Sequence, residues 1–153
     1  MRTYSVSFNN ISVASAITLI QIAAGANNSI RLIAGYIQQT GTTTNAQQRI
    51  QLIRKTAAAT VTSFTPVPFN PSDSASAAVG GAALTGVNAS AEGTNAATPI
   101  YNDAFSLLTG WWWKPIPEEY VEVKGGGIIG LVLPSLTTNP TVFTGELVYQ
   151  EFG

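Results

Sequence analysis

The chain has 153 residues, a length that suits one domain spanning residues 1–153, and its 7 Lys and Arg against 8 Asp and Glu give a net charge of −1. Cysteine and histidine are both absent, which excludes disulfides, thiolate metal sites and a Ser-His-Asp triad. Only 10% of the residues are charged, and without a long basic cluster we expect no nucleic-acid partner. The most apolar early stretch, 11–25, is too short and too interrupted to span a membrane, so we expect no membrane partner either.

Alternating apolar and polar residues predict strands in the first third of the chain. In "TYSVSF" the alternation places Tyr4, Val6 and Phe8 on one face and small polar residues on the other, as in a half-buried strand. Three further strands are expected in the segments 15–25, 29–40 and 46–56, the last with Ile50 and Leu52 on its apolar face.

The segment 29–40 contains a glycine in the middle of its pattern. Strict alternation would place four of its residues on one face: Ile30, Leu32, Ala34 and Tyr36. Gly35 then marks either a β-bulge or a point of close packing.

Residues 56–99 differ in character because they are rich in small residues, with Pro66, Pro68 and Pro71 close together. This composition predicts a long, mostly extended excursion with one weak strand near Ala82–Val87. Structureless stretches of this length are unusual inside compact domains, so we expect the excursion to be functional, ordered by a neighbour, or richer in strands than its composition indicates.

Strand patterns return in the last third of the chain, in the segments 101–113, 119–124, 128–134 and 141–153. In the last segment the alternation is imperfect, and Gly145 is the expected position of a slip. Together the patterns predict an all-β fold, an antiparallel β-sandwich that is jelly-roll-like, with about eight strands and one long Pro/Ala/Gly-rich connection.

The stretch "GGGIIG" matches the spacing of dinucleotide-binding loops through Gly125, Gly127 and Gly130. That motif requires a helix after the loop, whereas the residues that follow are typical of a strand and end at Pro134. We therefore interpret the glycine triplet as a turn between two strands, and we predict no cofactor site.

Acidic residues offer little catalytic chemistry. Glu118 and Glu119 are adjacent, and neighbours on a strand would point to opposite faces rather than converge as a glycosidase pair. Asp103 or Glu92 could supply a distant second carboxylate. Oxygen ligands near Asp73, Asn102 or Asp103 could hold calcium, but the EF-hand spacing is absent. We predict no catalytic residue and no metal site.

Three consecutive tryptophans are the most distinctive feature of the chain. In an extended segment Trp111 and Trp113 share a face and Trp112 takes the other, so the triplet is expected to join the core to an outer surface. Tryptophan is favoured where one side is apolar and the other wet, which fits a sandwich edge, a protein interface or a sugar platform.

Three stretches spread along nearly the whole chain, "TYSVSF", "GWWWKPIPEEYVEVKGGGIIGLVLP" and "TGELVYQEFG", resemble small structural proteins of tailed bacteriophages. The resemblance is closest to the jelly-roll decoration, or cement, proteins that bind outside a capsid. It implies a structural virion protein on the capsid exterior, made in the host cytoplasm, that stabilises contacts between capsomers. It also implies the major capsid protein as partner, a homo-oligomer with a trimer favoured over a dimer, and no enzyme activity.

The candidate contacts with the capsid or with other copies are apolar residues of the tryptophan triplet and the excursion: Trp111, Trp112, Trp113, Phe64, Val67 and Phe69. Two alternatives stay open. One is a carbohydrate-binding β-sandwich or fibre-tip receptor-binding module, in which an exposed tryptophan stacks on sugar. The other is an enzyme that uses acidic residues or calcium.

Overall fold

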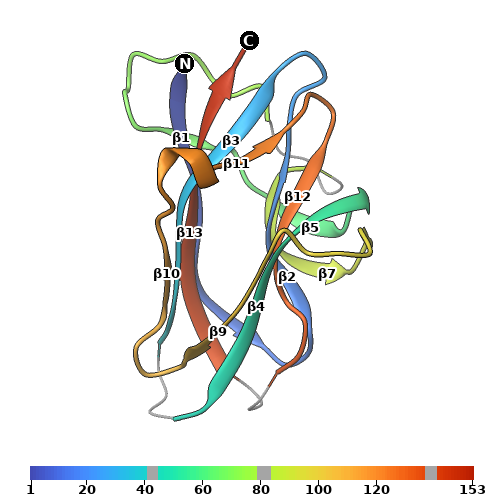
Figure 1. Cartoon of the computed structure of the whole chain (residues 1–153), viewed down its shortest axis with the longest axis vertical. Coiled ribbons are helices and arrows are strands. Elements are labelled where there is room, and N and C mark those ends of the chain that lie inside the picture. The colour runs from blue at the N-terminus through green and yellow to red at the C-terminus, as the bar shows by residue number, and fades with distance from the viewer. Residues whose placement is uncertain (41–44, 79–83, 137–140) are drawn as a thin grey trace.

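The computed structural model describes residues 1–40, 45–78, 84–136 and 141–153. These residues form two antiparallel sheets that pack face to face, with both termini at one end of the molecule (Figure 1). The first sheet consists of β1 (Arg2–Val13), β3 (Ser29–Gln39), β6 (Val67–Pro68), β10 (Trp111–Trp113), β11 (Val121–Val123) and β13 (Thr141–Phe152). The second consists of β2 (Ile17–Ala23), β4 (Gln47–Ala57), β5 (Thr60–Ser63), β7 (Gly86–Ala91), β8 (Thr94–Asn95), β9 (Tyr101–Ser106) and β12 (Ile128–Leu133).

Strands that follow one another in sequence lie mostly in opposite sheets. The first sheet has the order β1-β13-β3, with β10 and β11 both paired to β3, and the second has the order β2-β12-β4-β9. The chain changes sheet between β1, β2, β3 and β4, and again between β11, β12 and β13. This is the connectivity of a jelly roll, so the predicted all-β sandwich is confirmed.

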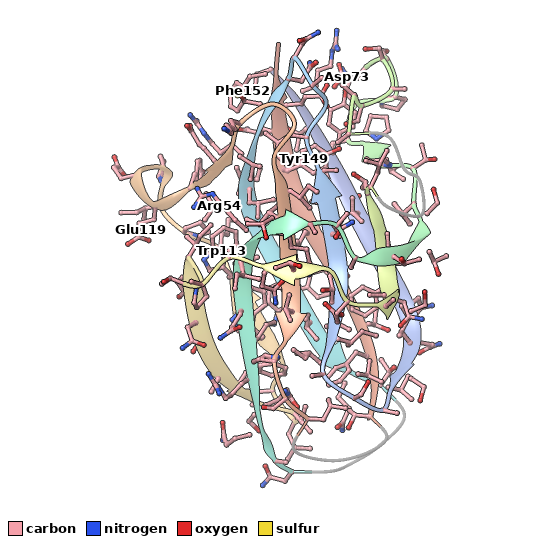
Figure 2. The ribbon with its side chains drawn as sticks, turned by 90° about the vertical axis from the view of Figure 1, so that its right-hand side faces the viewer. Arg54, Asp73, Trp113, Glu119, Tyr149 and Phe152 are labelled. Carbon is pink, nitrogen blue, oxygen red and sulfur yellow. The ribbon has the colours of Figure 1, made fainter. Side chains whose placement is uncertain are left out.

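The core lies between the sheets and is formed by alternate residues of the long strands. Tyr4, Val6 and Phe8 are buried on one face of β1, as their spacing predicts, and Ile50 and Leu52 are buried on β4. The rings of Tyr4 and Tyr149 stack inside it with centroids 5.5 Å apart (Figure 2 labels Tyr149). Aromatic rings thus fill the space between the two sheets at the end that holds the termini.

The prediction for the faces of β3 is right for its first half and wrong for its second. Ile30 and Leu32 point into the core, but Ala34 and Tyr36 lie on the outer face. The cause is Ile33, an extra residue on β3 that has no partner on β13. This bulge reverses the phase of the alternation, which strict period-two reasoning cannot foresee.

Gly35 is the close-packing point of β3 and not the bulge itself. The reversed phase turns Gly35 inward, where an added Cβ atom would lie 2.6 Å from Cδ2 of Leu147 and 3.3 Å from Cζ3 of Trp111. The absence of a side chain at this position therefore makes room for two large core residues.

The predicted slip at Gly145 is wrong. β13 alternates without interruption, so Gly145 points inward, where the ring of Phe8 lies 3.0 Å from the position of a Cβ atom. The irregularity is on the partner strand β1, where Asn9 and Asn10 together lie opposite Thr144. Asn10 has a φ of 52°, a conformation that asparagine tolerates better than most residues.

The excursion 56–99 is more structured than its composition predicts. It contains the short strands β5, β6 and β8 as well as β7, which begins later than the weak strand expected near 82–87 and overlaps it only at residues 86 and 87; residues 79–83 lie outside the described residues. β6 pairs with β1 and β7 pairs with β2. The excursion therefore extends both sheets along the side of the sandwich where β1 and β2 lie, and its last strand, β8, pairs with β4 at the other edge of the second sheet.

A buried hydrogen-bond network fixes the middle of the excursion against β13. The Ser76 hydroxyl donates to Oε2 of Glu151 at 2.6 Å, and its oxygen also lies 2.6 Å from the hydroxyl of Tyr149. The backbone N–H of Ala77 donates to the same carboxylate oxygen at 2.9 Å. Burial raises the pKa of the Tyr149 phenol well above its usual value, an effect that the hydrogen bond with Ser76 partly opposes.

The glycine triplet is a turn, as predicted. The N–H of Gly127 donates to the carbonyl of Lys124 at 2.9 Å, Gly126 has a φ of 73°, and β12 follows directly. The turn carries the chain from β11 in the first sheet to β12 in the second. In the described part of the chain no helix is long and apolar enough to cross a membrane.

Candidate binding surface

The tryptophan triplet forms the edge strand β10, and its side chains alternate between the core and solvent as predicted. Trp111 and Trp113 are buried, at 3% and 5% exposed, whereas Trp112 is 67% exposed. Trp112 lies opposite Tyr36 in the antiparallel pairing of β10 with β3. Because Ile33 reverses the phase of β3, this partner is an aromatic residue on the outer face.

The buried tryptophans pack against each other and against neighbouring side chains. The planes of their rings are inclined by 4° and the ring centroids are 6.5 Å apart. The centroid of the Tyr101 ring lies 6.1 Å from that of Trp113. Nε1 of Trp111 donates a hydrogen bond to Oδ2 of Asp103 at 3.2 Å. Asp103, a candidate catalytic or calcium-binding residue in the sequence, therefore anchors the indole of Trp111. Trp112, which lies between the two buried tryptophans, is therefore presented from a fixed support.

The outer face of the first sheet carries Trp112 and is poor in charge. Trp112 and Tyr36 stack with centroids 5.1 Å apart and ring planes inclined by 22°. Strand pairing defines two adjacent rows of outward-facing residues: Trp112, Tyr36, Glu146 and Ser7 in the first, and Ala34, Val148, Ser5 and Val67 in the second. Glu146 is the one charged residue in these two rows. We call these eight residues the outer face.

Electrostatics keep the aromatic part of the outer face neutral. Burial raises the pKa of the Tyr36 phenol, and the neighbouring Glu146 carboxylate raises it further. At the end of the sheet near β11, Arg31 pairs with Glu122 through Nε at 2.9 Å and lies 4.8 Å from the centre of the Phe152 ring. The charge of Arg31 is thus compensated locally.

The other candidate contact residues lie in three different settings. Val67 is 53% exposed and belongs to the outer face. It lies on β6, at the other edge of the sheet from β10, which carries Trp112. Phe69 is 61% exposed just after β6, where its N–H donates to the carbonyl of Thr3 at 2.9 Å. Phe64 is half-buried and packs against the hydrophobic core. Val67 therefore shares a sheet face with the stacked rings of Trp112 and Tyr36.

The two adjacent glutamates do not lie on a strand. The expectation that a strand directs their side chains to opposite faces is therefore wrong about the local structure. Glu118 and Glu119 belong to a short 3₁₀ turn, Pro117–Glu119, on the connection between β10 and β11. Both are exposed, and Glu119 projects from the outermost loop, away from the two sheets (Figure 2). Among the described residues no three acidic, histidine or cysteine side chains are grouped so as to hold a metal ion.

A pocket of about 570 Å³ lies at the junction of the two sheets, and alternation in the sequence does not reveal it. Its charged lining residues include Arg54, Glu122 and Lys124, from β4 and β11 and the turn after β11. Nη2 of Arg54 donates to the backbone carbonyl of Glu122 at 3.0 Å, so the guanidinium ties the sheets together across the pocket. Such a site depends on strand neighbours, which alternation does not specify.

The fold and the outer face define an all-β jelly-roll sandwich with an exposed, preorganised aromatic pair on one sheet. In comparisons with protein families, curated proteins and solved structures, no family model, protein or structure matched the chain.

Proposed function

We propose that the protein is a structural virion protein that binds the outside of a bacteriophage capsid, as a decoration or cement protein, and stabilises contacts between capsomers. The observation that carries this proposal is the 67% exposed Trp112 stacked on Tyr36 in a charge-poor sheet face. Tryptophan and tyrosine are enriched at the energetic centres of protein interfaces, where charged residues are depleted.

Two further observations support the proposal. Three stretches of the sequence resemble decoration proteins, and jelly rolls serve as domains of viral capsids. The partner we propose is the major capsid protein, and the protein acts as a homo-oligomer, preferably a trimer. In this arrangement the outer face is covered in the assembled particle, and the rigid sandwich transmits the contact between neighbouring capsomers.

The test is binding of the purified protein to capsids that lack it, measured by cosedimentation and by imaging of the particles. We expect regular decoration by the wild-type protein and at least about tenfold weaker binding by Trp112→Ser. Leu84→Ser is the matched control, because Leu84 is a 48% exposed apolar residue next to β7 of the second sheet. Undecorated capsids, or equal loss with both variants, would contradict the proposal.

A carbohydrate-binding module, such as a fibre-tip receptor-binding domain, is the second candidate. The same exposed indole favours it, because sugar rings stack on aromatic faces and jelly rolls also occur as lectin domains. Binding to a glycan array that is lost in Trp112→Ala, together with no affinity for capsids, would replace the capsid proposal with this one.

A further inference from the structure

Lys55 has an unusual environment for a lysine, because its side chain is fully buried, at 0% exposed. It lies on β4, and its Cε atom is 2.9 Å from the position that a Cβ atom would take at Gly130 on the neighbouring strand β12. A buried ammonium requires compensating partners, and a desolvated lysine amine is a nucleophile in many proteins.

Two side chains meet the Lys55 amine. Nζ lies 2.8 Å from Oδ1 of Asn95 and 3.3 Å from Oε2 of Glu92. Asn95 is on β8, directly opposite Lys55 in the antiparallel pairing with β4, so the strand register itself brings the amine to the amide. The amine, the amide and the carboxylate therefore converge from segments 37 to 40 residues apart in sequence.

The Glu92 carboxylate is fixed in position by β2. Its Oε2 atom accepts a hydrogen bond from the Thr18 hydroxyl at 2.5 Å, and its Oε1 atom accepts one from the Thr18 backbone N–H. Both carboxylate oxygens are thereby engaged, and Oε2 is also held towards Lys55. A carboxylate placed within reach of both an amine and an amide can transfer protons between them.

We propose that Lys55 and Asn95 join in an intramolecular isopeptide bond, with Glu92 as the proton-transfer group. The Lys55 ammonium gives a proton to the Glu92 carboxylate, and the neutral Nζ attacks Cγ of Asn95 to form the new C–N bond. Glu92 protonates the Nδ2 amide nitrogen, the Cγ–Nδ2 bond breaks, and ammonia leaves with the remaining proton as ammonium. The reaction consumes no oxidant, reductant or water.

The geometry favours this chemistry in three respects. The amine is held within hydrogen-bond distance of the carbonyl that it attacks, which replaces a bimolecular encounter with a local step. Burial of the Lys55 side chain removes competing water from the nucleophile. Glu92 and Asn95 both line a small pocket of about 200 Å³ beside β12, through which ammonia can leave.

The decisive measurement is the intact mass of the purified, folded, full-length chain. The isopeptide bond lowers it by one ammonia, about 17 Da. Proteolysis between Lys55 and Asn95, for example after Glu92, must then yield two chains that remain joined through these two residues. An unmodified mass overturns the proposal, and so does a loss of ammonia located in a peptide without Lys55.

Variants test whether Glu92 transfers protons in the reaction or only lies beside the reacting groups. Glu92→Gln can still accept the hydrogen bond from the Thr18 backbone N–H through its amide oxygen but cannot take the proton from Lys55, so we expect the unmodified mass. Glu122→Gln is the matched control, since Glu122 forms the other ion pair found in the described residues, with Arg31, and must leave the bond intact. A crosslinked Glu92→Gln protein would overturn the role of Glu92, while the wild-type peptide map tests the bond even if this variant does not fold.

Discussion

The indole ring of Trp112 stacks on the phenol ring of Tyr36, with centroids 5.1 Å apart, on the side of the first sheet that faces away from the core. Its two neighbours in sequence are buried on the other side of the same strand. One short strand therefore serves stability with two of its rings and presents the third to solvent, so the two roles can be separated by mutation.

Substitution of the buried and exposed tryptophans should have very different effects on stability. Trp113→Ala removes a 5% exposed ring and should lower the free energy of unfolding by about 3–5 kcal/mol. Trp112→Ala loses only the stack on Tyr36, about 0.5–1.5 kcal/mol. Urea denaturation followed by far-ultraviolet circular dichroism measures both values without depending on tryptophan fluorescence. Equal destabilisation would show that Trp112 belongs to the core.

An alanine at position 35 should destabilise the protein although it adds a single methyl group. The added Cβ would lie 2.6 Å from Cδ2 of Leu147, so this fully buried side chain must move within a packed core, at a cost of about 1–3 kcal/mol. Ala34→Val is the control, because it enlarges the next residue on the outer face and should change stability by about 0.5 kcal/mol or less. Chemical denaturation of both variants tests this, and a neutral Gly35→Ala would mean that the Leu147 side chain repacks without cost.

Alternation in the sequence predicts faces well wherever a strand is regular. The burial of Tyr4, Val6 and Phe8 and the opposite orientation of Trp112 within its triplet both follow from a period of two, and the structure confirms them. The same rule fails after Ile33, because a bulge is set by the pairing with β13 and leaves no mark in the sequence of β3.

Features that depend on which strands are neighbours could not be predicted. The cluster of Lys55, Glu92 and Asn95 exists only because β8 pairs with β4, and Glu92 was visible in the sequence merely as a lone carboxylate. The excursion was underestimated for the same reason, since Ser76 is ordered by a buried contact with Glu151 from the far end of the chain. Composition describes such a segment but not its partners.

The buried Tyr149 predicts a loss of stability at alkaline pH. Its folded-state pKa is raised above the usual value of about 10, so above that pH the unfolded chain releases the phenolic proton first. The contribution of Tyr149 is therefore complete below pH of about 10, and above it stability falls by up to about 1.4 kcal/mol per pH unit. Denaturation of wild type and Tyr149→Phe between neutral and strongly alkaline pH measures this. The variant should show the shallower fall, and identical slopes would contradict the assignment.

If Lys55 and Asn95 are joined covalently, substitution of Asn95 should lower the free energy of unfolding far more than substitution of an exposed asparagine that only forms a hydrogen bond. The bond would close a loop between residues 40 apart in sequence, which by loop-closure entropy is worth about 4 kcal/mol. Asn95→Ala removes the carbonyl that Lys55 attacks but keeps the pairing of Lys55 with Glu92, so this variant should unfold at a much lower urea concentration. Asn102→Ala is the control, because Asn102 lies on β9 along the same edge of β4 and makes a 3.2 Å hydrogen bond with Gln51 on the surface. Its effect should stay within about 0.5–1.5 kcal/mol, the range of a single surface hydrogen bond. If both variants lower the free energy of unfolding by the same small amount, no covalent bond contributes to stability. Only such a bond would make the loss in Asn95→Ala several times the loss in Asn102→Ala.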